Sequence, residues 1–137
     1  MDMSVNEYNR VWVKLCGEED DHVSSMRRDR LRGGRSGEQA IRAIGRYKLY
    51  CFSERLNAEY ACPWTSMKGH ESVKLYLLNK HHWQREAVEF LKEQDLMYLL
   101  HAELIEMKLN EIESYPVHQW GCQDEAWLLI EPHIHPA

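Results

Sequence analysis

The sequence contains 137 residues, of which 44% are hydrophobic and 28% are charged, and its formal net charge is −5. These values are typical of one globular domain whose core needs neither a disulfide nor a structural metal. The apolar content excludes a disordered chain, and the seven scattered glycines exclude a collagen-like repeat. No uncharged apolar run reaches 18 residues, which excludes a membrane-spanning helix. We therefore expect a single helical domain over residues 1–137.

A helix is predicted near the start of the chain, over residues 5–16. Apolar residues recur there at spacings of three and four, and Ser4 with Glu7 has the spacing of a capping box. We expect Gly17 to end this helix and the acidic run 18–21 to be solvated. Charged residues interrupt the first fifteen positions, so they lack the apolar core of a secretory signal. The expected compartment is the cytoplasm, with the four cysteines mostly as buried thiols.

A second, longer helix is predicted between Ser36 and Cys62. Residues 23–35, which precede it, have few apolar positions, so we expect a short helix or a loop there. Ser36 with Gln39 repeats the capping-box spacing, and Pro63 prevents continuation beyond Cys62. This helix is apolar around much of its circumference and is expected to be central. A strand over 47–52 is the alternative, because aromatic residues favour strands.

Helical spacing continues through most of the second half of the chain. It predicts a short helix over 71–79 and, over 83–114, one helix of about 30 residues or two helices joined near Gln94-Asp95, with Asp95 as an N-cap. Pro116 and Gly121 are expected to interrupt the chain after that.

The last residues are expected to be a short non-helical segment. The apolar run 126–130 is too short to distinguish a strand from a helical turn, and 131–137 is expected to be an extended end packed by Ile134. The predicted fold class is all-α: a single irregular bundle of four or five helices.

Charge is strongly segregated along the chain. Residues 27–48 contain eight basic residues against Asp29 and Glu38, a net charge of +6, which leaves −11 for the rest of the chain. Such a block either binds an anion, such as nucleic-acid phosphates, or pairs with acidic residues within the fold. The candidate nucleic-acid or anion-binding residues are Arg27, Arg28, Arg30, Arg32, Arg35, Arg42, Arg46 and Lys48.

Aromatic residues and a group of histidines supply two further candidate sites. Trp64, Trp120 and Trp127 have no periodicity that places them in the core, so we expect them at a protein interface. Histidine and cysteine donors near the end of the chain are candidates for a zinc site, but their spacing is looser than that of structural zinc sites and favours exposed histidines and a buried thiol. The candidate metal ligands are His118, Cys122, His133 and His135.

Catalytic motifs are absent from the sequence. It contains no Gly-x-Ser-x-Gly, no His-Glu-x-x-His and no phosphate-binding loop. We therefore expect a non-enzymatic protein that binds another protein or itself, in a regulatory or adaptor role. The alternatives are a nucleic-acid-associated regulator using 27–48 and, third, a zinc-binding protein. Apart from zinc in that third alternative, no cofactor is expected, nor is a membrane partner or a small-molecule substrate.

Overall fold

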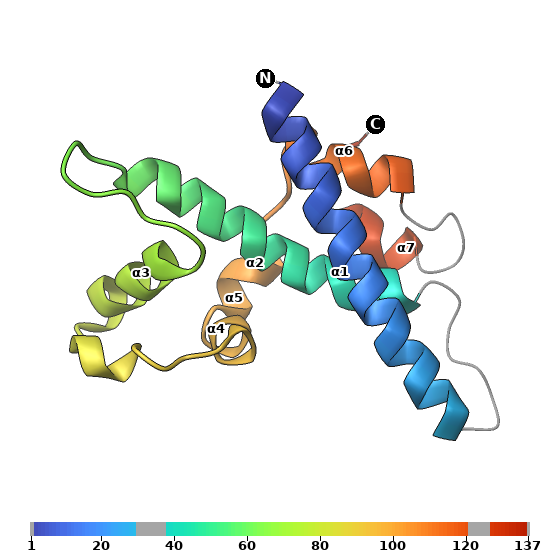
Figure 1. The fold of residues 1–137 in the computed structure, drawn as a ribbon, viewed down its shortest axis with the longest axis horizontal. Helices are drawn as coiled ribbons and strands as arrows, with labels where there is room; N and C mark the ends of the chain where they lie inside the picture. Colours follow the sequence, from blue (N-terminus) through green and yellow to red (C-terminus); the bar gives the residue numbers. More distant parts are fainter. Residues whose placement is uncertain (1, 30–37, 121–126, 137) are drawn as a thin grey trace. The chain divides into compact units, whose positions relative to one another are not determined.

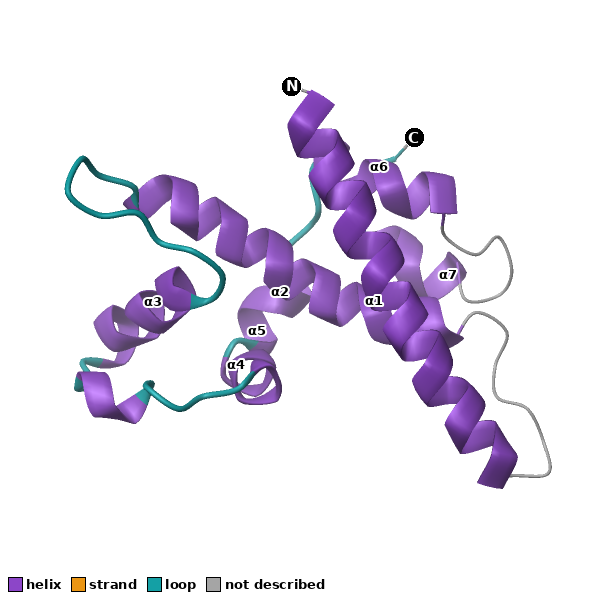
Figure 2. Cartoon of the chain, in the orientation of Figure 1, coloured by secondary structure: helices purple, strands orange, loops and turns teal. Residues whose placement is uncertain are grey.

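The fold is helical throughout the part of the chain that the structure describes. The computed structural model describes residues 2–29, 38–120 and 127–136, and the side chains within these ranges except those of 2–5, 20–29, 38–40 and 120. Figures 1 and 2 show helices and loops in these ranges and no strand. The helices are α1 (Asp2–Asp29), α2 (Glu38–Tyr60), α3 (Glu71–His81), α4 (Glu93–Leu99), α5 (His101–Glu106), α6 (Glu111–Trp120) and α7 (Trp127–Ile130), with 3-10 turns η1 (Arg85–Ala87) and η2 (Glu131–His133).

The all-α prediction is therefore confirmed, and the predicted number of helices is too low. Internal contacts divide the chain into two compact units. We call Met1–Tyr47 together with Met107–Ala137 the terminal unit, and Lys48–Glu106 the central unit. Each unit has its own group of buried side chains.

In the terminal unit, α1 packs along α6 (Figure 1). Trp12 of α1 is completely buried and meets the ring of Tyr47 edge-on, with the ring centroids 5.2 Å apart. The Tyr47 hydroxyl donates a hydrogen bond to the backbone carbonyl of Glu113 at 2.5 Å. Aromatic packing and a satisfied buried hydroxyl therefore connect α1, α2 and α6 in one core.

The prediction that the first helix ends at Gly17 is wrong, because α1 continues to Asp29. The residues after Gly17 were expected to be solvated, but Glu18 and Glu19 pair with Arg46 of α2 at 2.9 and 3.3 Å, and Glu19 also pairs with Arg42 at 3.1 Å. These ion pairs hold the acidic run on a helical face and offset the helix penalty of one glycine, which is about 1 kcal/mol. The predicted short helix or loop over 23–35 is partly the end of α1, and 30–35 lies outside the described residues.

In the central unit, the predictions for α2 and α3 are confirmed. The alternative strand over 47–52 is excluded, since these residues belong to α2. The hydroxyl of Tyr76 and the ammonium of Lys80, both on α3, donate to Oε2 of Glu103 on α5, at 3.0 and 2.7 Å. These contacts to a half-buried carboxylate fix α3 against α5.

The prediction of one or two helices over 83–114 is wrong, because this stretch contains η1, α4, α5 and the start of α6. Polar side chains start new helices within it: the Asp95 carboxylate accepts the backbone N–H of Lys92 at 2.9 Å, at the start of α4. Asp95 thus lies inside the first turn rather than at the N-cap. A straight helix over this stretch would be about 45 Å long. Short helices instead let the chain turn and bury apolar residues along its length, namely Val88, Leu96, Leu100, Leu104 and Leu109.

The C-terminal segment, expected to be non-helical, forms α7 and η2 instead. Residues 126–130 had been expected to form either a strand or a helical turn, and residues 127–130 form a helical turn. Pro116 was expected to interrupt the chain, but it lies inside α6, where the loss of one backbone hydrogen bond is accompanied by burial of Pro116 and Val117. Ile134 is 1% exposed, so the prediction that it packs the end of the chain is confirmed. Gly121 lies outside the described residues.

Candidate functional site

The candidate site lies on α6, and a reciprocal pair of hydrogen bonds positions the start of that helix. The backbone N–H of Asn110 donates to Oε1 of Glu113, and the backbone N–H of Glu113 donates to Oδ1 of Asn110, each at 2.9 Å. This capping box satisfies backbone donors that the first turn of a helix leaves without partners. It therefore fixes where α6 begins.

The chain end is attached to α6 by hydrogen bonds on both sides of Ile134. The backbone N–H of Leu109 donates to the carbonyl of His133 at 2.9 Å, and the backbone N–H of His135 donates to the hydroxyl of buried Ser114 at 2.8 Å. The His118 ring donates from Nε2 to the carbonyl of His135 at 2.6 Å. Together with burial of Ile134, these bonds hold residues 133–136 along α6.

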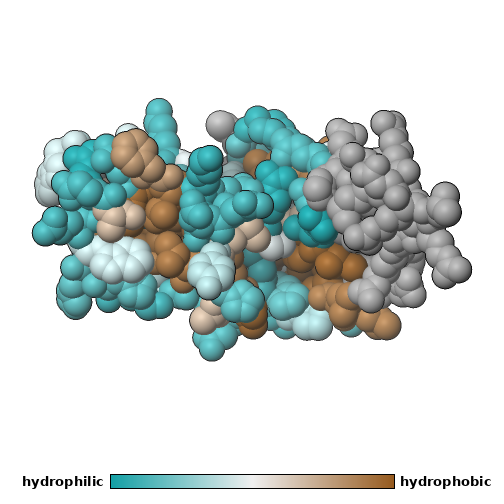
Figure 3. Space-filling model, turned by 90° about the horizontal axis from the view of Figure 1, so that it is seen from below, coloured by the Kyte–Doolittle hydropathy of each residue, from teal (hydrophilic) through white to brown (hydrophobic). Residues whose placement is uncertain are grey.

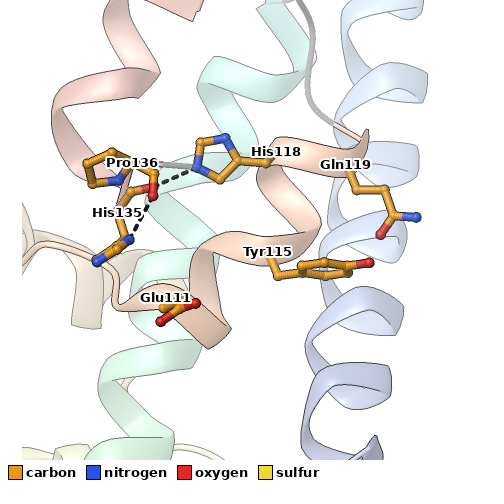
Figure 4. A pocket seen from close by; sticks show the side chains of 6 residues that line it. All are labelled: Glu111, Tyr115, His118, Gln119, His135 and Pro136. Carbon is orange, nitrogen blue, oxygen red and sulfur yellow. Dashed lines mark hydrogen bonds between the residues drawn. The ribbon is translucent and has the colours of Figure 1, made fainter.

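A pocket of about 500 Å³ opens between α6 and this attached chain end (Figure 4). Four lining residues share one face of α6, because their positions differ by four, seven and eight from the first, and two more come from the chain end. Its volume falls in the range of small-ligand sites. The lining residues are Glu111, Tyr115, His118, Gln119, His135 and Pro136.

The two histidines of the pocket have defined ring orientations. A carbonyl oxygen only accepts hydrogen bonds, so the ring nitrogen next to it carries the proton. His118 is therefore protonated at Nε2, and His135 is protonated at Nδ1, which donates to the carbonyl of Pro136 at 2.8 Å (Figure 4). In the neutral rings, His118 Nδ1 and His135 Nε2 are the remaining acceptors.

α7 places one aromatic side chain beside the pocket and carries two exposed leucines. The rings of Trp127 and His118 lie 5.5 Å apart, and the Trp127 indole N–H donates to Oε2 of Glu131 at 3.2 Å. The next two residues, Leu128 and Leu129, are 73% and 48% exposed. We call the pocket together with Trp127, Leu128 and Leu129 the α6–α7 surface.

The structure brings together some of the predicted zinc ligands, but in a different role. His118 and His135 meet at the pocket, where the His118 ring contacts the His135 backbone rather than its ring. His133 is half-buried, and Cys122 lies outside the described residues. Within residues 2–29, 38–120 and 127–136, no group of three histidine, cysteine or acidic side chains is placed to hold a metal ion.

Three of the eight predicted anion-binding residues form ion pairs or hydrogen bonds within the fold. Arg42 and Arg46 form the ion pairs with α1 described above. Lys48 is 3% exposed and its ammonium donates to the carbonyl of Leu104 at 2.7 Å; burial lowers the pKa of this amine to about 8. The remaining five have side chains outside the described residues: Arg27, Arg28, Arg30, Arg32 and Arg35.

The three predicted interface tryptophans have different surroundings. Trp64 lies in the loop between α2 and α3 and is 85% exposed, whereas Trp127 is half-buried at the pocket. Trp120 ends α6, and its side chain lies outside the described residues. Phe90 and Tyr98 of the central unit are as exposed as Trp64. The left side of Figure 3, where α3 lies in Figure 1, shows hydrophobic residues open to view among hydrophilic ones.

A serine–histidine pair in the central unit was not singled out from the sequence. Oγ of Ser53 lies 2.9 Å from Nδ1 of His70, and Ser53 Oγ also donates to the carbonyl of Leu49 at 2.9 Å. A hydroxyl has one proton, so His70 donates to Ser53 here and does not act as its base. Ser53 is 1% exposed, and burial lowers the pKa of the His70 imidazole. This pair fixes the residue before α3 and offers no accessible nucleophile.

Four other lining residues had not been singled out from the sequence: Glu111, Tyr115, Gln119 and Pro136. The signal for the first three was Asn110 followed three residues later by Glu113, which marks a helix start and would have placed these side chains on one face. Because helical spacing continues through residues 83–114, it obscured the start of α6 within that stretch.

No family model matches the chain, and no curated protein or solved structure shows significant similarity to it. Among the described helices, none combines the length and apolar character required to cross a bilayer.

Proposed function

We propose that this protein acts by binding another protein through the α6–α7 surface. The observation that supports this proposal is the pair of exposed leucines on α7, directly after Trp127, whose ring contacts the pocket residue His118. Covering such apolar area with a partner is favourable, and a neighbouring pocket gives the partner a place to anchor a side chain.

The composition of the pocket favours binding over catalysis. None of its six lining residues is serine, threonine, cysteine or lysine, and one ring nitrogen of each lining histidine is engaged by a backbone carbonyl. The aromatic ring of Tyr115, which is 49% exposed, is a typical anchor at protein interfaces. The role we propose for a protein that binds a partner in this way is regulatory or that of an adaptor.

Site-specific photo-crosslinking in the cells that express the protein tests the proposal. A benzophenone amino acid replaces Leu128 in one full-length variant and Tyr98, which is 83% exposed in the central unit, in a matched control. We expect a discrete cross-linked protein from position 128 that is absent from position 98. Mass spectrometry of the product distinguishes a partner protein from a second copy of this chain.

A second variant tests whether the cross-link depends on this surface. Replacing Leu129 by aspartate in the position-128 probe variant should abolish the cross-link, because a desolvated carboxylate is costly at an interface. Far-UV circular dichroism should be unchanged, since Leu129 is 48% exposed. Equal cross-linking from positions 98 and 128, or no cross-link at all, would overturn the proposal.

A further inference from the structure

The pocket of the α6–α7 surface is rich in hydrogen-bond acceptors, because most of the polar side-chain atoms that are not already bonded to the chain end accept hydrogen bonds. Glu111 offers carboxylate oxygens, and in their neutral forms His118 and His135 offer Nδ1 and Nε2. Gln119 adds an amide oxygen next to its amide donor. None of the six lining residues is lysine or arginine.

The Glu111 carboxylate is the charged group of this pocket. Its side chain is exposed, and no hydrogen bond or ion pair to it occurs among the described residues. Neighbouring glutamates differ in this respect: Glu113 is buried and bonded to Asn110, and Glu131 accepts the Trp127 indole. Glu111 thus retains its full capacity to accept hydrogen bonds from a ligand.

Tyr115 places an aromatic ring one helical turn from Glu111, on the same face of α6. The ring is half exposed, so one of its surfaces remains open to a ligand. A cation stacked on a tyrosine ring beside a carboxylate gains from both groups.

We infer that this pocket binds an arginine side chain presented by the partner protein, which rests on the function proposed above. A guanidinium carries five N–H donors and no acceptor, which complements an acceptor-rich lining. It is flat and stacks on an aromatic ring more readily than the compact ammonium of lysine. Outside the basic segment 27–48 the chain has a net charge of −11, which favours approach of a basic partner.

Titration with defined peptides, followed by NMR of the full-length protein labelled with ¹⁵N, tests this inference. The probe is the peptide acetyl-Gly-Leu-Arg-Leu-Gly-amide, and the control peptide has citrulline, which is uncharged and nearly isosteric, in place of arginine. We expect the arginine peptide to shift the backbone amide signals of Tyr115, His118 and Gln119. The citrulline peptide should bind at least about fivefold more weakly, since an ionised donor forms the stronger hydrogen bonds.

Charge-matched variants identify the carboxylate responsible. Glu111→Gln should weaken binding of the arginine peptide about threefold to tenfold, and Tyr115→Leu about twofold to fivefold. Glu106→Gln removes the same charge from an exposed position outside the pocket and should leave the affinity unchanged. The ¹⁵N spectra of the free variants report whether each one is folded.

Three results would overturn the inference: equal binding of the arginine and citrulline peptides, equal binding of a peptide with lysine at that position, or unchanged affinity of Glu111→Gln. If any of these results occurs together with cross-links from position 128, the proposed protein interface stands and only the binding of an arginine side chain is overturned. Arginine-selective shifts without cross-links would instead overturn the interface and leave a cation-binding pocket.

Discussion

Replacing Lys48 by methionine should remove a pH dependence from the stability of this protein. The Lys48 side chain is buried and bonded to the carbonyl of Leu104, and its pKa falls from 10.5 to about 8 in the folded chain because burial disfavours the charged form. Between these two values the unfolded chain binds more protons than the folded chain, so stability increases as the pH rises.

The lowered pKa sets the size of this effect. With one pKa unit worth about 1.4 kcal/mol, the shift corresponds to about 3 kcal/mol over the full window, of which about 2 kcal/mol falls between pH 7.5 and pH 9.5. Well below pH 8 the amine is charged in both states and its contribution no longer changes. Methionine has a similar length and cannot titrate, so Lys48→Met should lack this increase.

Urea denaturation followed by circular dichroism at pH 7.5, 8.5 and 9.5 measures the difference between the two proteins. At each pH, the free energy of unfolding of the variant is subtracted from that of the natural chain, which cancels the contributions of the cysteines and tyrosines that both proteins share. The absolute stability of the variant is less informative, because loss of the hydrogen bond to Leu104 and relief of the buried charge oppose each other. Parallel pH profiles for both proteins would refute the argument from burial.

Three other substitutions test the packing of the terminal unit by urea denaturation. Arg46→Gln should lower the free energy of unfolding by about 1 kcal/mol in dilute buffer and by less in 0.5 M NaCl, because salt screens its ion pairs with α1. Tyr47→Phe should cost about 1–3 kcal/mol by leaving the buried carbonyl of Glu113 without its donor; a cost below 0.5 kcal/mol would contradict that hydrogen bond. Ile134→Ala should cost about 2–4 kcal/mol through the cavity it creates. Leu128→Ala, at a position 73% exposed, should stay within about 0.5 kcal/mol, and equal losses for these last two variants would contradict the attachment of the chain end.

Local sequence signals accounted for the helices that begin and end at strong markers. Pro63 stops the chain soon after α2, and apolar spacing over 71–79 identified α3, whose final turn ends where His82 adopts a left-handed conformation with φ of 56°. Such signals act within one or two turns, so they can be read from neighbouring residues alone.

Signals that depend on a distant partner were misjudged. Gly17 appeared to end a helix because glycine is a common helix stop and acidic residues follow it. Arg42 and Arg46, more than twenty positions further on, pair with Glu18 and Glu19 and stabilise the helix there. The same pairing accounts for Arg42 and Arg46 of the basic segment, for which the sequence left open both an anion-binding site and pairing within the fold. Charge counting cannot distinguish a pair within the fold from a site for an external anion.

The candidate site shows the same division between local and distant causes. His118, Trp127 and His135 were singled out for two unrelated reasons, as metal ligands and as an interface residue, and the structure places them around one pocket. Their proximity requires the chain end to return along α6, held by Ser114 and by burial of Ile134.

The sequence by itself determined the all-α class, the extent of α2 and α3 and the burial of Ile134, because apolar spacing and helix-ending residues act locally. Only the tertiary structure decided that 83–114 divides into short helices, that the acidic run remains in α1 and that α6 and the chain end enclose a pocket. The reason is that a segment adopts the conformation that buries its apolar residues and pairs its polar groups with the rest of the fold, and those partners lie far away in the sequence.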